Sequence, residues 1–203
     1  MQLGDIANIK TGLVLSRKKV EIEYEAKATY KLLSLKNIGE DGTFINESFE
    51  EFASNDILDD HYFTQEGDVL IRLSQPYTAV YIDKKHSGLL VPSYFAMIKV
   101  YDTGILPQYL AWYLNTKNVK FELERSQFGT RIPSTNQHAL KSIPIKVPPL
   151  SRQKALMELY MLHQKEKRLY QQLIEEKEKL FQGIAQQLIG GYQHDGKSDA
   201  RKN

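Results

Sequence analysis

Apolar residues in the last quarter of the chain repeat with the spacing of an α-helix. They recur at steps of three and four residues, or at sums of these steps, and form one stripe: Leu159, Leu162, Leu169, Leu173, Leu180, Ile184 and Leu188. Pro148 and Pro149 prevent a helix before them, Ser151 offers an N-cap, and neither proline nor glycine follows until Gly183. The pattern predicts a single long helix at residues 149–190.

The length of this helix predicts how its apolar stripe is covered. Residues 151–189 would span roughly 58 Å at about 1.5 Å per residue, whereas the ~150 residues before them would form a domain about 40 Å across. Because the helix outreaches that domain, we predict that a second helix of the same kind covers the stripe, and its seven residues are the candidate dimer interface. Glu166 and Glu176 fall on this seam, where polar residues set register or partner at some cost in stability. The alternative is a helix that bends and packs back on its own domain.

Shorter apolar runs before residue 148 predict one globular domain of strands and short helices. Runs with β-type patterns lie at 30–38, 68–73, 78–83, 88–91, 94–100 and 143–147. Helical spacing is found at 106–115, 117–127 and 135–140, and the acidic stretch 44–63 indicates irregular structure. We therefore expect an α+β fold, with a mixed sheet-and-helix domain at 1–148, the long helix at 149–190 and a disordered tail at 191–203.

The composition excludes several classes of protein. The chain has no cysteine, which excludes disulfides, thiolate metal sites and cysteine nucleophiles. No apolar run reaches the ~18 residues that a membrane-spanning helix needs, and the first residues do not form a signal peptide. These observations favour a cytoplasmic protein.

Charge is unevenly distributed along the chain although the net charge is only +2. No lysine or arginine lies between Lys36 and Arg72, a stretch that carries ten acidic residues: Glu40, Asp41, Glu47, Glu50, Glu51, Asp56, Asp59, Asp60, Glu66 and Asp68. Lysine and arginine outnumber acidic residues in the rest of the first 150. Such a partition could orient a polyanion on one face. The alternative is solvated charge that is segmented only in sequence.

Catalytic and cofactor-binding patterns are missing from the sequence. No two of the five histidines have zinc-site spacing, and there is neither a GxGxxG motif nor a P-loop. Glu25-Ala26-Lys27 resembles the end of a nuclease motif, but no Pro-Asp pair precedes it. We therefore predict a binding protein that is not itself an enzyme and that uses no metal or cofactor.

Several loop segments carry side chains suited to DNA. Phosphate contacts need lysine and arginine, whereas base edges are read by arginine, lysine, asparagine, glutamine or serine. Four sets meet this description: Arg17, Lys18 and Lys19; Arg72, Ser74, Gln75 and Tyr77; Lys84 and Lys85; and Gln127, Thr130, Arg131 and Asn136. Each single residue could equally be a solvated surface residue, so the prediction rests on the sets. Aromatic residues such as Tyr62, Phe95 and Tyr109 are expected to pack in the core or between helices.

The order of several segments resembles the specificity subunit of type I restriction-modification systems. The similarity lies in the opening Leu3-Gly4-Asp5-Ile6 with Thr11-Gly12, the strand Gly67–Ile71, the helix Pro107–Leu114, Gly129-Thr130, and LKSIPIKVPPLSRQ at Leu140–Gln153. Each short match is weak, but together they cover nearly the whole chain. Family members usually carry two target-recognition domains and two long helices, whereas this chain has one of each and resembles a half-length form.

The resemblance implies a non-catalytic adaptor that reads double-stranded DNA. Its partners would be adenine methyltransferase subunits, which use S-adenosylmethionine, and an ATP-driven restriction subunit where one is present. Two copies, or this chain and another half-subunit, would pair antiparallel through their helices and read two inverted half-sites separated by unread bases. The alternatives are a stand-alone dimeric DNA-binding regulator or decoy without a methyltransferase, and a small nuclease, which the missing metal ligands disfavour.

Overall fold

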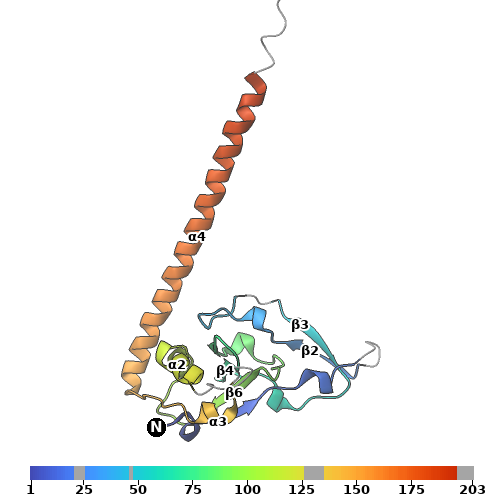
Figure 1. The fold of residues 1–203 in the computed structure, drawn as a ribbon, viewed down its shortest axis with the longest axis vertical. Helices are drawn as coiled ribbons and strands as arrows, with labels where there is room; N and C mark the ends of the chain where they lie inside the picture. Colours follow the sequence, from blue (N-terminus) through green and yellow to red (C-terminus); the bar gives the residue numbers. More distant parts are fainter. Residues whose placement is uncertain (21–25, 46–47, 126–134, 196–203) are drawn as a thin grey trace, which may run out of the picture. The chain divides into compact units, whose positions relative to one another are not determined.

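The computed structural model describes residues 1–20, 26–45, 48–125 and 135–195. The chain divides into two compact units, Met1–Ala155 and Leu156–Asn203. The first unit contains β-sheets and short helices, and the second consists of most of helix α4 (Figure 1). This arrangement confirms the predicted α+β domain followed by a long helix. No helix among the described residues is both long and apolar enough to cross a membrane.

A four-stranded antiparallel sheet, in the order β1-β6-β4-β5, is the centre of the first unit. Its strands are β1 (Ala7–Thr11), β4 (Val69–Arg72), β5 (Ala79–Tyr81) and β6 (Phe95–Val100). The side chains of Val69, Leu70 and Ile71 are all fully buried, which explains why β4 reads as a continuous apolar run rather than as an alternating one. The core on one side of this sheet comprises Leu33, Leu70, Val80, Ile82, Leu89, Val91, Phe95 and Met97.

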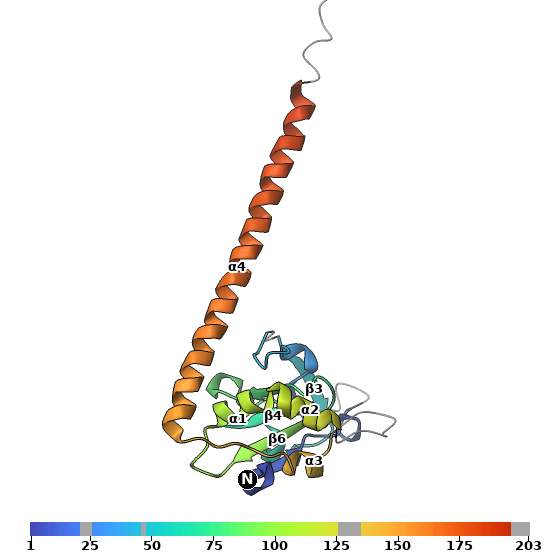
Figure 2. The same cartoon turned by 60° about the vertical axis from the view of Figure 1, so that its left-hand side comes forward.

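Three short helices flank the four-stranded sheet. Helix α1 (Pro107–Leu114) packs against β4 and β5 and contacts α2 (Lys117–Arg125), whereas α3 (Gln137–Lys141) packs against β1 and the 3₁₀ turn Leu3–Asp5 (Figure 2). All three fall where helical spacing predicts them.

A second, two-stranded sheet pairs β2 (Ala28–Leu32) with β3 (Glu50–Ser54). Strand β3 lies in the acidic stretch 44–63, which the sequence predicts to be more irregular than regular; most of its described residues are irregular, but β3 is a strand that the pattern did not predict. Phe52 and Ser54 are buried, and Glu51 lies opposite Lys31 in the register, which offsets its charge. The strand is stabilised by its partner rather than by local preference.

The predicted strand at 143–147 is absent. Ile143 and Ile145 are buried, and their backbones bond to Leu3 N–H and Met1 O, but only an isolated bridge joins Gln2 to Pro144. Pro144 has no N–H to donate to a ladder, which interrupts the alternating pattern that the isoleucines suggest. Residues 88–91 likewise form only isolated bridges through Leu90, rather than a strand.

Helix α4 spans Leu150–Asp195, 46 residues without interruption. It begins one residue before Ser151, and the amides of Arg152 and Gln153 bond to Pro149 O, so Ser151 lies in the first turn and is not the N-cap. The helix continues five residues past the predicted end at 190. The remainder of the tail, residues 196–203, lies outside the described residues.

Candidate nucleic-acid interface

One end of the four-stranded sheet brings together several of the described residues that the sequence predicts to bind DNA. In the strand register Thr11 lies opposite Ala96, Ala96 lies opposite Ile71, and Arg72 lies opposite Phe95. The ends of β1 and β4 therefore meet the start of β6. We call this edge the Arg72 end of the sheet.

Backbone hydrogen bonds fix the loops of the Arg72 end beside one another. Gly12 N–H donates to Phe95 O (3.1 Å), and Leu73 N–H donates to Tyr94 O (2.9 Å). The start of α3 joins the same cluster, because Thr135 N–H donates to Leu73 O (2.7 Å). The loops after β1 and β4 and the segment entering α3 are thus held by the sheet.

A groove of about 450 Å³ opens beside the loop after β1. It is lined by Lys10, Thr11, Gly12, Leu13, Val14, Arg17, Lys18, His61, Tyr62 and Gln137. The Gln137 amide donates to Thr11 Oγ1 (2.8 Å), which places a glutamine side chain from α3 against the end of β1. Three cationic side chains, an amide and two ring systems in one groove can meet phosphates and base edges together.

The basic run at the groove is only partly neutralised by acidic neighbours. Lys18 Nζ lies 2.7 Å from Asp56 Oδ2, and this hydrogen bond and its charge raise the pKa of Lys18 and lower the pKa of Asp56. Arg17 and Lys19 are exposed. Lys18 is therefore engaged in an ion pair at the protein surface, whereas Arg17 and Lys19 are exposed beside it.

The loop after β4 presents polar groups at the same end. Arg72 Nε donates to Ser74 Oγ (3.1 Å), and the exposed Gln75 side chain donates to Glu124 Oε1 of α2 (3.4 Å). Tyr77, by contrast, is fully buried and has a left-handed backbone (φ 52°). Because its side chain does not reach solvent, we leave Tyr77 out of the interface.

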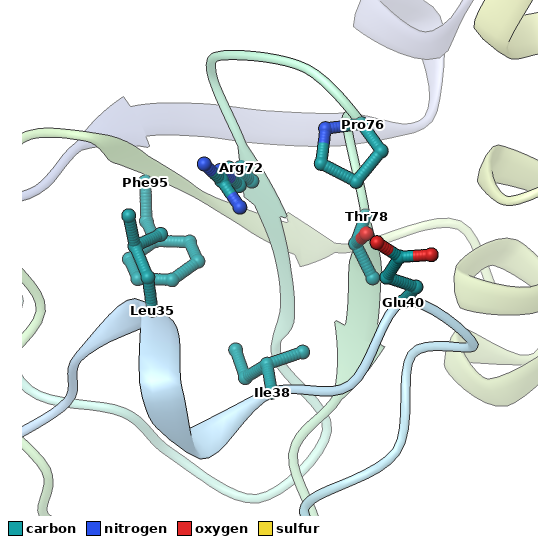
Figure 3. Close-up of a pocket in the computed structure, with 7 residues that line it drawn as sticks. All are labelled: Leu35, Ile38, Glu40, Arg72, Pro76, Thr78 and Phe95. Carbon is teal, nitrogen blue, oxygen red and sulfur yellow. The ribbon is translucent and has the colours of Figure 1, made fainter.

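A small pocket lies beside Arg72, lined also by Leu35, Ile38, Glu40, Pro76, Thr78 and Phe95 (Figure 3). Its volume of about 20 Å³ accommodates little more than one water molecule. It cannot admit a base, so this pocket is a packing feature rather than a nucleotide site.

Lys84 and Lys85 lie at the other end of the sheet. Strand β5 runs from Ala79, opposite Ile71, to Tyr81, opposite Val69, so the turn after it is carried away from Arg72. Both lysines are exposed in the turn Lys84–His86, which is capped by Asp83. The structure therefore does not bring this set together with the others.

The last predicted set is only partly described. Gln127, Thr130 and Arg131 lie in 126–134, outside the described residues. Asn136 is exposed, and its side chain caps α3 by accepting from Ala139 N–H (2.9 Å). The local role of Asn136 is therefore that of a helix cap at the Arg72 end.

Sequence patterns alone did not single out Lys10, His61, Tyr62 and Gln137, which line the groove. The alternation of β1, in which Ala7 and Ile9 are buried whereas Asn8 and Lys10 are exposed, is a signal that could have found Lys10. The other three reach the groove through tertiary contacts from distant segments.

The acidic sector is interleaved with basic residues. Asp56 pairs with Lys18, Glu50 lies 3.4 Å from Lys36, and Glu51 faces Lys31 across the β2–β3 pair. At these three positions the acidic stretch is therefore matched by basic residues from outside it. Among the described residues, no group of three histidine, aspartate or glutamate side chains is placed to hold a metal ion.

The apolar stripe of α4 is exposed in the single chain. Its exposed fractions range from 48% at Ile184 to 66% at Leu188, and Leu159, Leu162, Leu169, Leu173 and Leu180 fall between them. Tyr170, Ile174 and Phe181, on the neighbouring side of the helix, are also exposed. Burial of such residues is worth about 1.5–3 kcal/mol each, so the stripe favours a partner surface.

The chain thus joins a sheet with polar and basic loops at one end to a long amphipathic helix. The model of the type I restriction modification DNA specificity domain family matches residues 1–178. The chain belongs to this family. No curated protein matches the sequence.

Solved structures share the fold at low sequence identity. One comes from work on complex assembly and conformational transition of the type I R-M system, and it matches with a TM-score of 0.66 at 14% identity. The match covers 100% of this chain and 50% of the chain in that structure. The HsdS subunit from Thermoanaerobacter tengcongensis has a TM-score of 0.65 at 16% identity, covering 92% and 47%. The type I restriction-modification S subunit from M. genitalium has a TM-score of 0.50 at 16% identity, covering 83% and 39%. This chain spans half or less of the length of these structures.

Proposed function

We propose that this chain is a non-catalytic recognition module of a type I restriction-modification system and that it reads double-stranded DNA with the Arg72 end of its sheet. The observation that supports this most directly is the convergence there of loops from β1, β4 and α3. Family membership supports a role in DNA recognition, and the convergence of these loops supports the Arg72 end as the surface that contacts DNA.

The chemistry of the groove divides the proposed contacts into two kinds. Lys10, Arg17 and Lys19 neutralise phosphates, because they are cationic and lie on or beside the groove. Gln75 and Gln137 read base edges, because an amide can donate and accept at once. Both amides are already held in place by hydrogen bonds, which lowers the entropy cost of ordering them on DNA.

Helix α4 is the proposed assembly element. Its exposed stripe would be covered by an equivalent helix running antiparallel, so that two recognition modules face inverted half-sites. The charged faces that remain would dock adenine methyltransferase subunits, and an ATP-dependent restriction subunit where one is present. Copurification with a methyltransferase subunit distinguishes this role from that of a stand-alone regulator.

Charge reversal at the two ends of the sheet tests the proposed DNA surface. The variant Arg17→Glu/Lys19→Glu should weaken binding to all duplexes by about tenfold or more at low salt and flatten the dependence of affinity on salt. Lys84→Glu/Lys85→Glu is the matched control, because it makes the same change in net charge at the opposite end. Fluorescence anisotropy across a salt series measures both.

Two results would contradict the proposal. One is an equal loss of affinity in both double variants, which would indicate only a general effect of net charge. The other is unchanged sequence preference after Gln75→Ala and Gln137→Ala, which would remove these amides from base readout. Thermal unfolding of each variant confirms that it remains folded.

A further inference from the structure

Two oppositely charged residues interrupt the exposed apolar stripe of α4. At about 100° per residue, Glu166 lies roughly 20° and Lys177 roughly 40° from Leu173 around the helix axis. Both are therefore within the stripe, between Leu162 and Leu180. Glu166 is 60% exposed, and its contacts within the helix are long: 3.9 Å to His163 Nδ1 and 3.4 Å to Tyr170 Oη. These weak local contacts leave its carboxylate accessible to a partner.

The two charges are placed symmetrically about the midpoint between Leu159 and Ile184 of the stripe. Consider two copies of α4 that run antiparallel and cross between Gln171 and Gln172. Leu159 of one copy then lies opposite Ile184 of the other, and Leu162 and Leu169 lie within one residue of the positions opposite Leu180 and Leu173. In this same register Glu166 of each copy lies opposite Lys177 of the other. The dimer therefore contains two Glu166–Lys177 pairs of opposite charge.

We infer that α4 is self-complementary: its partner is a second copy of this chain, held antiparallel in the register that pairs Glu166 with Lys177. This inference rests on the proposed pairing of α4 and deepens it by fixing partner and register. A charge within an apolar seam is costly unless it meets an opposite charge, which is how such residues specify one alignment.

Other arrangements of the same two helices lose this match. A parallel pair in register would place Glu166 against Glu166 and Lys177 against Lys177. Sliding the antiparallel pair by one heptad in total would place Glu166 against Ile184 and Lys177 against Leu173. Each alternative buries like charges or an unpaired charge, and each is therefore disfavoured.

The residues that flank the seam agree with the inferred register. On one side Lys165 of one copy approaches Glu176 of the other, again with opposite charges. Glu176 lies about 60° from Leu173, so it flanks the seam rather than lying on it as the sequence pattern predicted. On the other side Tyr170 approaches Ile174, and His163 approaches Phe181, which extends the apolar contact. Two-fold symmetry repeats each contact, so a single substitution acts twice in the dimer.

A charge-swap series in the full-length chain tests the register. Glu166→Lys and Lys177→Glu should each weaken self-association by roughly tenfold, because two attractive contacts become repulsive. An equimolar mixture of the two variants should associate like the wild type, since each supplies the charge that the other needs. The double variant Glu166→Lys/Lys177→Glu should also restore the dimer. Sedimentation equilibrium measures all four.

Cysteine cross-linking gives an independent measure of direction, because the natural chain has no cysteine. Leu159→Cys mixed with Ile184→Cys should form a heterodimeric disulfide, because these positions meet only in the antiparallel pair, whereas a parallel pair would link each variant to itself. A wild-type chain that stays monomeric would overturn both the pairing and the register. A wild-type dimer whose charge variants all associate equally would overturn the register alone and leave the proposed function standing.

Discussion

Replacing Gln153 with leucine removes the polar contacts that fix the start of α4. The Gln153 side chain is fully buried. Its Oε1 accepts from Leu106 N–H (2.8 Å), and its Nε2 donates to Gly104 O (2.8 Å) and Pro148 O (2.7 Å). One amide thus joins the turn before α1, the proline pair and the first turn of the helix.

The expected cost follows from these three bonds. Leucine has a similar size, so the substitution leaves little cavity and mainly strands an N–H and two carbonyl groups. At about 0.5–1.5 kcal/mol net for each of the three hydrogen bonds, Gln153→Leu should lower the free energy of unfolding by about 1.5–4.5 kcal/mol. Urea denaturation followed by circular dichroism measures this, and hydrogen exchange should show faster exchange of the Leu106 amide.

Gln108→Leu is the matched control, since Gln108 is exposed on α1. That change should alter the free energy of unfolding by no more than about 0.5 kcal/mol. If Gln153→Leu is as mild as the control and the Leu106 amide stays protected, then the three bonds do not hold the helix start, and the reasoning is refuted.

Two further predictions concern stability. At Gly12 an added Cβ would overlap the carbonyl oxygens of Val91 and Pro92, so Gly12→Ala should destabilise the protein by about 1–3 kcal/mol. Gly183 has open space around it, so Gly183→Ala should stabilise α4 by up to about 1 kcal/mol. Thermal melts measure both changes. Burial raises the pKa of Asp68 above its ordinary value of 3.8. Between these two pKa values, Asp68 therefore keeps its proton in the folded protein but loses it in the unfolded chain. The free energy of unfolding should therefore fall as pH rises from that value through the raised pKa, and Asp68→Asn should flatten this fall in urea titrations; an unchanged slope would contradict the assignment.

Local patterns in the sequence were sufficient for the helices and for the central strand. The periodicity of α4 and α1 is contained in neighbouring residues, and the apolar run of β4 is unmistakable. Strand β3 was missed because its charge is offset by Lys31 on another strand, which no local window contains. The prediction of a strand at 143–147 was wrong because it relied on the alternating isoleucines and did not take into account that Pro144 lacks an N–H group.

The candidate site was predicted in part for the same reason. Arg17 and Gln75 follow strands whose ends the register brings together, so loop position was informative. Lys84 has the same loop character, but the direction of the β4–β5 hairpin carries it to the other end of the sheet. Tyr77 looked like a loop residue, yet tertiary packing buries it. Gln137 reaches Thr11 across 126 residues, a contact that only the fold reveals.

Selection of bound duplexes from a randomised DNA pool by the purified chain tests the central claim most directly. Recognition by a symmetric pair of modules predicts one enriched pattern, with the same half-site present twice in opposite orientations and a fixed number of unselected bases between them. Enrichment of a single ungapped site, or retention of DNA without sequence preference, would contradict it.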